Sequence, residues 1–140
     1  GNTKDIICLG PTSTFSFGKY YAQSTYDLHE YRDSVEKGIF PISKNYELND
    51  NDILRRECNF SLQCNQLLDI KKIEEKYNIN FDTYFSKEIA KIKEYEKSGF
   101  LSLVNNKIQV TTLGRYFIRH ICQIFDTFID EESEYKVHGN

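Results

Sequence analysis

The sequence of 140 residues lacks methionine, and it lacks any apolar run near the roughly 18 residues that a membrane-spanning helix needs. Its first residues also lack the charged and apolar regions of a signal peptide. We therefore expect no membrane association and a cytoplasmic location. Because a native chain starts with methionine and this one opens directly into the apolar run at 6–9, we expect a fragment of a larger protein.

Closely spaced cysteine pairs are also absent, since Cys8, Cys58, Cys64 and Cys122 form no CxxC motif. A structural zinc site needs such pairs, and a disulfide framework is typical of small secreted domains. We therefore expect no metal site and interpret the four cysteines as buried free thiols in a reducing compartment.

The chain also lacks an excess of positive charge, because it has 18 basic and 21 acidic residues and a net charge of −3. Such a balance gives no general attraction to nucleic acid or to anionic membranes. The length predicts one domain, or a small domain with part of another attached. Tyrosine and phenylalanine are abundant, with ten of each and no tryptophan, so we expect aromatic rings to supply much of the core.

The N-terminal part has the pattern of an α/β unit. Residues 6–9 form a continuous apolar run that predicts a strand buried on both faces, and the Ser/Thr/Gly-rich segment 11–18 predicts a loop after it. Ser24 with Asp27 resembles a capping box that starts a helix to about Lys37, ended by Gly38 and Pro41. The side chains that we expect to face inward are Leu28, Tyr31 and Val35.

An extended connector is predicted at 40–48, and the pattern after it becomes helical. Capping residues predict three helices, the first from Asn49 or Asp50 to about Asn65. The other two are expected at Asp69–Tyr77 and, with Asp82 as the cap and Gly99 as the stop, at Asp82–Lys97.

A β-hairpin and a long helix are predicted to complete the chain. Residues 100–104 and 107–110 flank Asn105-Asn106, two residues that tolerate positive φ. From Thr112 onward, apolar side chains recur at three- and four-residue steps, which is the stripe of an amphipathic helix. The stripe consists of Leu113, Tyr116, Phe117, His120, Ile121, Ile124, Phe125 and Phe128.

Three helices, a hairpin and a long helix are the order of a winged-helix-like domain, and the fold class is mainly α (α+β). Winged-helix domains often bind nucleic acid through the third helix, which makes a nucleic-acid binder one alternative. Residues 50–130 contain twelve basic and twelve acidic side chains, and three of the acidic ones lie on the third helix. Since a phosphate-binding face needs net positive charge, we expect no nucleic-acid partner.

Two arginine pairs are the candidate binding residues. Arg55 and Arg56 lie beside the apolar stripe of the first of these helices, and Arg115 and Arg119 are one turn apart on the last. Guanidinium groups form strong bidentate bonds with carboxylates, so the pairs suit a ligand with several carboxylates. The alternative is that both pairs lie on solvated helix faces next to Asp52, Glu57 and Asp126. We expect His120 to be a core histidine with a hydrogen-bond partner, and His29 and His138 to be exposed.

Several segments together resemble the C-terminal part of oxygen-independent coproporphyrinogen III oxidase, a radical S-adenosylmethionine family. They occur in the order and near the spacing of that family, and they include Tyr21-Ala-Gln-Ser24, Asp52-Ile-Leu-Arg-Arg56 and Cys64-Asn-Gln-Leu-Leu-Asp69. The remaining segments lie at 9–16, 46–48, 81–85 and 110–126. The haem-chaperone branch of the same superfamily typically lacks the first and third of these segments, and it remains an alternative as a haem-binding homologue.

The resemblance implies an N-terminal barrel-like domain that holds a [4Fe-4S] cluster on a CxxxCxxC loop and uses S-adenosylmethionine to generate a radical. The family converts two propionates of coproporphyrinogen III to vinyl groups, giving protoporphyrinogen IX in haem biosynthesis. By this resemblance, residues 1–45 are the last strand, loop and helix of the barrel, and 46–140 form a winged-helix-like domain that covers the active site. The fragment alone lacks the cluster ligands and should be inactive; its partners should be its own radical domain and the substrate, and we expect a monomer.

Site residues follow only in part from the resemblance. The segment 10–16 matches one that lies beside a second S-adenosylmethionine in the family, with Thr14 in a place usually held by isoleucine. Ser24, Gln66 and His120 also replace the usual residues. Coproporphyrinogen III carries four propionates. We therefore take four arginines as candidate substrate-binding residues, namely Arg55, Arg56, Arg115 and Arg119. No catalytic and no metal-binding residue is expected in this chain.

Overall fold

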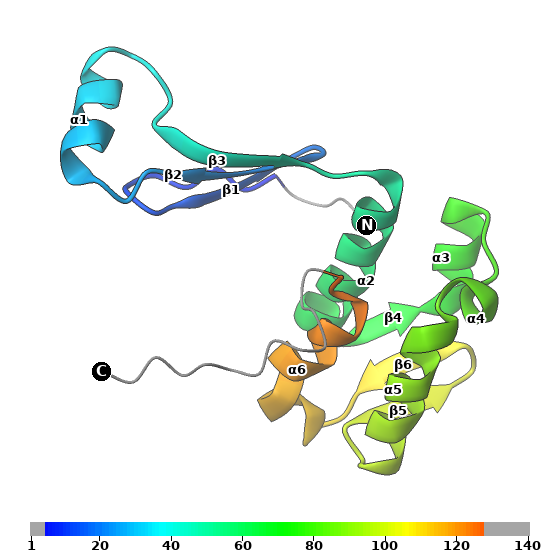
Figure 1. Cartoon of the computed structure of the whole chain (residues 1–140). Coiled ribbons are helices and arrows are strands. Elements are labelled where there is room, and N and C mark those ends of the chain that lie inside the picture. Colours follow the sequence, from blue (N-terminus) through cyan, green and yellow to red (C-terminus); the bar gives the residue numbers. More distant parts are fainter. Residues whose placement is uncertain (1–4, 128–140) are drawn as a thin grey trace. The chain divides into compact units, whose positions relative to one another are not determined.

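The computed structural model describes residues 5–127. The chain divides into two compact units, Gly1–Ile53 and Leu54–Asn140, so the change of unit lies within the helix that begins at Asp50. The elements are a mixture of helices and two small antiparallel sheets, one in each unit (Figure 1). No helix among the described residues is long and apolar enough to cross a membrane.

The first unit is an antiparallel sheet in the order β1-β2-β3, with one helix between the second and third strands. Its elements are β1 (Thr14–Phe17), β2 (Tyr20–Ser24), α1 (Leu28–Glu36) and β3 (Ile42–Glu47). Gly18, with a φ of +54°, makes the tight turn from β1 to β2. The Asp27 carboxylate caps α1 by accepting hydrogen bonds from two backbone N–H groups, those of His29 and Glu30.

The predicted buried strand at 6–9 is wrong. Ile6 forms one isolated bridge with Ser16, and the side chains of Ile7 and Leu9 are 63% and 92% exposed. The loop predicted at 11–18 is also wrong in its second half, which is β1. A short apolar run becomes a buried strand only when neighbouring strands pair with it, and among the described residues the run has this single bridge.

The start and the packing of α1 also differ from the prediction. Ser24 ends β2 and is 2% exposed, and its hydroxyl donates to the Gly10 carbonyl at 2.7 Å, so Asp27 takes the capping role. Leu28 and Val35, predicted to face inward, are 70% and 51% exposed. The connector predicted at 40–48 contains β3, whose six exposed residues lack the alternation that marks a half-buried strand.

The second unit contains the predicted helices and hairpin around a sheet in the order β4-β6-β5. Its first elements, which begin with the helix that crosses the change of unit, are α2 (Asp50–Asn65), β4 (Leu67–Asp69), α3 (Ile70–Tyr77) and α4 (Phe81–Tyr84). The next are α5 (Ser86–Lys97), β5 (Leu101–Val104) and β6 (Lys107–Val110). The predictions of α2, α3 and the hairpin are confirmed, whereas the three-residue strand β4 was not predicted because it is too short for a periodic pattern.

The helix starts show which capping predictions were correct. Asn49 and Asp52 cap α2 reciprocally, each side chain accepting the backbone N–H of the other, at 2.9 and 3.1 Å. Asp69 caps α3 as predicted. Asp82 is not a cap, because Asn80 accepts the Thr83 N–H and starts α4, and α5 begins at Ser86.

The core of the second unit is aromatic at its centre. The rings of Phe81, Phe85 and Phe125 are all at most 1% exposed, and the Phe85 centroid lies 4.8 Å from that of Phe81 and 5.0 Å from that of Phe125. Leu62, Cys58 and Ile121 are equally buried in the same cluster. The prediction that rings supply much of the core is confirmed here.

The long helix predicted from Thr112 is wrong in its length. The segment consists of a 3₁₀ turn, η1 (Gly114–Phe117), a short helix, α6 (Ile118–Cys122), and a second 3₁₀ turn, η2 (Gln123–Phe125). Gly114 packs directly on the Phe100 carbonyl, so a Cβ atom at this position would overlap that oxygen. The Thr111 hydroxyl accepts the Gly114 N–H at 3.0 Å, as an N-cap residue does, and the segment begins as a 3₁₀ turn.

The apolar stripe of this segment is confirmed only in its second half. Ile121, Ile124 and Phe125 are buried, whereas Leu113, Tyr116 and Phe117 are exposed. His120 is also exposed, so the core histidine was predicted wrongly; its ring lies edge-on to Phe117 at 6.4 Å. Phe128 and His138 lie outside the described residues, and His29 is exposed as expected.

Candidate functional site

Arg55 is held by an ion pair inside the second unit. Its guanidinium donates to the Glu88 carboxylate at 2.7 Å, and both side chains are largely buried, with 14% and 13% exposed. The guanidinium carbon also lies 5.2 Å from the centroid of the Phe85 ring. The solvated face proposed as the alternative is therefore wrong for Arg55, because its partner is Glu88 on α5.

The acids predicted to accompany the arginines of α2 have other partners. Asp52 accepts the Tyr46 hydroxyl at 3.0 Å as well as the Asn49 N–H. Glu57 accepts both the Lys76 ammonium and the Tyr77 hydroxyl. Burial and the hydrogen bond to Glu57 raise the pKa of Tyr77. Arg56 is half-buried on the same helix.

Arg115 and Arg119 are exposed on the last segment of the described chain. Arg115 lies in the 3₁₀ turn η1, and Arg119 lies in α6, so the regular one-turn spacing of a single α-helix is not present. Tyr116, between them in sequence, is 83% exposed. Exposed guanidinium groups such as these suit an anionic partner.

Thr14 begins β1 and is exposed. The turn before it is fixed by hydrogen bonds that were not predicted from the sequence. The Ser13 N–H donates to the Ser24 hydroxyl at 2.9 Å, and the Gly10 N–H donates to the Tyr31 hydroxyl at 2.9 Å. The Gly-Pro sequence indicated a turn here, but nothing in the sequence identified Ser24 and Tyr31 as the groups that fix it.

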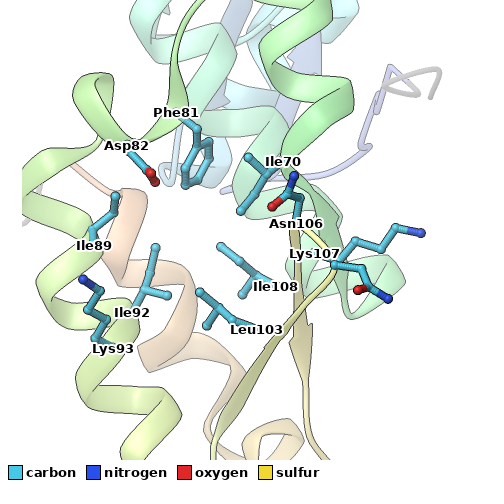
Figure 2. A pocket seen from close by; sticks show the side chains of 11 residues that line it. Ile70, Phe81, Asp82, Ile89, Ile92, Lys93, Leu103, Asn106, Lys107 and Ile108 are labelled. Carbon is cyan, nitrogen blue, oxygen red and sulfur yellow. The ribbon is translucent and has the colours of Figure 1, made fainter.

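A pocket of about 550 Å³ lies in the second unit, among the helices α3, α4 and α5 and the β5–β6 hairpin. Figure 2 shows isoleucine and leucine side chains that converge on it from α3, α5 and both strands. Polar groups at its edge come from Asp82, Lys93 and Lys107 and from the two asparagines of the hairpin turn. The sequence analysis did not identify this pocket, although Ile89 and Lys93 are one helical turn apart on α5.

The cysteines do not form a metal-binding group. All four are free, and among the described residues no cluster of three or more His, Cys, Asp or Glu side chains is placed to hold a metal ion. Cys58 is buried, and burial raises the pKa of its thiol to about 12, which opposes the thiolate form that metal binding needs. Cys64 is exposed, so the expectation that all four are buried is wrong.

The comparisons with known proteins agree with this mixed α+β arrangement. The model of the HemN C-terminal domain family matches residues 48–117. The oxygen-independent coproporphyrinogen III oxidase of Helicobacter pylori (strain ATCC 700392 / 26695) is 35% identical over 123 residues, which are 88% of this chain and 27% of that protein. The oxidase of the same name from Thermostichus vulcanus is 33% identical, over 94% of this chain and 41% of that protein.

A solved structure shows the same fold. The coproporphyrinogen III oxidase (HemN) of Escherichia coli, described as a radical SAM enzyme, superposes with a TM-score of 0.80 and 30% identity, covering 92% of this chain and 30% of that one. The chain is thus related to a radical SAM enzyme. It belongs to the HemN C-terminal domain family, which is a C-terminal portion of oxygen-independent coproporphyrinogen III oxidase. It spans only 27% to 41% of the length of the relatives compared here.

Proposed function

We propose that this chain is the C-terminal portion of an oxygen-independent coproporphyrinogen III oxidase. The complete enzyme would convert two propionate side chains of coproporphyrinogen III to vinyl groups in haem biosynthesis. The observation that carries the proposal is the extent of the similarity, which covers 92% of this chain in the superposition on the Escherichia coli enzyme. A match limited to the domain at 48–117 would support only a shared module.

The cofactors of such an enzyme would be bound by the rest of the protein. The described residues offer no metal-binding cluster, and the most buried thiol, that of Cys58, is held in its neutral form. We therefore assign the [4Fe-4S] cluster, with the S-adenosylmethionine that supplies the radical chemistry when bound to it, to residues outside this chain. The isolated chain should therefore form no radical-generating centre and should be inactive alone.

The two units would have different roles in the complete enzyme. We assign residues 1–45 to the end of the barrel-like domain and 46–140 to a winged-helix-like domain that covers the active site. Exposed apolar side chains support the first assignment, since Leu9, Ile39 and Phe40 are 92%, 60% and 73% exposed in the first unit. Apolar surface of this kind is typical of a face that packs against another part of a protein.

The substrate-binding role is assigned most readily to the exposed arginines. Arg115 and Arg119 are accessible to a propionate, and Arg56 is partly accessible. The ion pair with Glu88 supports a structural role for Arg55 instead. Thr14 remains our candidate for the contact with a second S-adenosylmethionine, since it is exposed next to the fixed turn at Gly10–Ser13.

The test is turnover by the full-length protein with a reconstituted cluster. We expect decarboxylation of coproporphyrinogen III that depends on S-adenosylmethionine. An intact cluster with no turnover, together with stoichiometric tight binding of haem in a spectral titration, would contradict the oxidase and favour the haem-chaperone type.

The order of three main helices, α2, α3 and α5, before the β5–β6 hairpin also favours a winged-helix nucleic-acid binder as a second candidate. The equal numbers of basic and acidic residues in 50–130 disfavour it. A mobility-shift assay at low salt separates the two, and we expect no shift of duplex DNA or RNA by the purified chain. Binding whose affinity falls steeply with added salt would support the second candidate.

A further inference from the structure

The pocket of about 550 Å³ lies entirely within the second unit and combines apolar side chains with polar ones. Its floor consists of Phe81, Ile92 and Ile108, which are at most 2% exposed. Its walls are Ile70, Ile89 and Leu103, whose side chains point toward the floor residues in Figure 2. The volume is typical of small-molecule sites, which occupy about 300–1,000 Å³ and combine apolar side chains with a few polar groups.

The hairpin wall of the pocket is fixed before any ligand binds. Asn105 and Asn106 have φ values of +52° and +58°, which define the tight two-residue turn between β5 and β6. The Ile70 N–H donates to the Asn106 carbonyl at 3.0 Å and joins the turn to α3. The Leu103 N–H donates to the Glu96 carboxylate at 3.1 Å and joins β5 to α5. A preformed wall lowers the entropic cost of binding.

The charges near the opening favour an anion. Lys93 lies one turn after Ile89 on α5, so that an ammonium group stands beside the apolar wall. Two acids of α5 have partners elsewhere or in the backbone, since Glu88 pairs with Arg55 and Glu96 accepts the Leu103 N–H. Lys107 lies 3.9 Å from Asp69, an ion pair that is weak at this distance and exposure.

Asp82 is the acidic side chain among the residues that line the pocket, and Lys93 and Lys107 are the basic ones. It comes from α4, and Lys93 comes from α5 (Figure 2). A ligand with an apolar body and one carboxylate would place the body on the isoleucines and the carboxylate at Lys93. We propose that this pocket binds an amphipathic carboxylate of small-molecule size.

The proposal does not depend on the oxidase activity. Two sources share the chemistry, a fatty-acid type of molecule and a tetrapyrrole with propionate side chains. Two probes distinguish them, dodecanoate below its micelle concentration and coproporphyrin III, each added to the intact 140-residue chain.

The readout is the isoleucine δ1-methyl NMR spectrum, because Ile70, Ile89, Ile92 and Ile108 line the pocket. Ile121 and Ile124, buried in the same unit, serve as internal references. We expect saturable shifts of the four pocket methyls with at least one of the two probes, and smaller changes at the references. If only coproporphyrin III gives these shifts, the ligand is a tetrapyrrole; if dodecanoate gives them, an alkyl carboxylate suffices.

Variants test the two parts of the site. Lys93→Glu should weaken binding about tenfold by placing a second negative charge at the carboxylate position, whereas Lys97→Glu, exposed on the same helix and outside the pocket, should leave it within about twofold. Leu103→Asp, at a position that is 38% exposed, should abolish binding while the reference methyls keep their shifts.

Three results would overturn the proposal. The first is the absence of saturable shifts at the pocket methyls with both probes. The second is an equal loss of probe affinity in Lys93→Glu and in Lys97→Glu. The third is equally tight binding of dodecyltrimethylammonium, which would show that the site does not select the carboxylate.

Discussion

At the scale of single residues, Arg55 and Arg119 are both arginines on helices, but their surroundings assign them opposite roles. Arg55 lies against Phe85 and pairs with Glu88 in a largely buried site. Arg119 is exposed on α6. The sequence showed both as members of a pair beside an apolar stripe, and only the position of Glu88, 33 residues away, separates them.

Removal of the Arg55 side chain should therefore destabilise the second unit. Arg55→Ala leaves the Glu88 carboxylate without its partner in a site with 13% exposure, and we expect a loss of about 3 kcal/mol in the free energy of unfolding. Urea unfolding followed by circular dichroism measures it. Lys71→Ala, which removes an exposed pair with Glu75, is the control and should change stability by less than about 0.5 kcal/mol. Equal effects of the two substitutions would contradict the structural role of Arg55.

Arg115→Ala and Arg119→Ala should change the stability of the chain by less than about 0.5 kcal/mol, because both side chains are exposed. In the complete enzyme the same substitutions should raise KM for coproporphyrinogen III if a propionate binds there. The comparison is between urea unfolding of the chain and steady-state kinetics of the complete enzyme. A large loss of stability with unchanged KM would refute the binding role.

The buried thiol of Cys58 predicts a loss of stability at alkaline pH. Burial raises its pKa from 9.0 to about 12, so between these values the unfolded chain releases a proton that the folded chain retains. The free energy of unfolding should fall by up to about 1.4 kcal/mol per pH unit from this group across that window, and Tyr77, whose pKa is also raised, acts in the same direction. Below pH 9 the contribution is fully present.

Urea unfolding at several alkaline pH values measures this slope. Cys58→Ala should make it shallower, whatever the substitution does to stability at neutral pH. Thr112→Ala, at an exposed position whose side chain does not titrate, is the control and should leave the slope unchanged. Identical slopes for the wild type and Cys58→Ala would contradict the buried neutral thiol.

At the scale of elements, Gly114 allows the last segment to pack closely on the Phe100 carbonyl. In a continuous helix from Thr112, Gly114→Ala would stabilise the chain by up to about 1 kcal/mol, because alanine is the better helix former. In the structure the new Cβ atom overlaps the Phe100 carbonyl, so we expect a loss of about 2–3 kcal/mol. Urea unfolding of Gly114→Ala and of the wild type gives the change in the free energy of unfolding. A loss agrees with the close packing on Phe100, and a gain would support the continuous helix.

The elements that could be predicted from sequence are those fixed by local chemistry. Asn49 and Asp69 cap helices with their own side chains, and Asn105-Asn106 forms the turn of the hairpin, so the surrounding structure hardly matters there. β3 and the last segment could not be predicted, because they depend on contacts with distant residues. The Gly114 backbone is shaped by Phe100, and β3 exists because it pairs with β2.

The same distinction holds for the candidate sites. Residue type and spacing identified arginines suited to carboxylates, but the pocket between α5 and the hairpin depends on two elements that meet only in three dimensions. The buried ion pair of Arg55 depends on the packing of α2 against α5 in the same way. The order of the segments that resemble the family, in contrast, was sufficient to suggest the family that the comparisons then showed.

At the scale of the whole molecule, the two units differ in how they are stabilised. The second unit has a continuous core of buried apolar side chains, with Phe85 and Ile121 at its centre. The first unit exposes much of its apolar surface, including Leu9 and Phe40. We interpret this contrast as that of a domain with its own core and a segment that packs against another part of a longer enzyme.

The most direct test of the central claim is turnover by a chimera. The matched C-terminal region of the Escherichia coli oxidase is exchanged for this chain, and protoporphyrinogen IX formation is compared with that of the same enzyme truncated before the region, at equal cluster content. We predict that the chimera converts coproporphyrinogen III and that the truncated enzyme does not. A folded chimera with a loaded cluster and no more turnover than the truncated enzyme would contradict the proposed function.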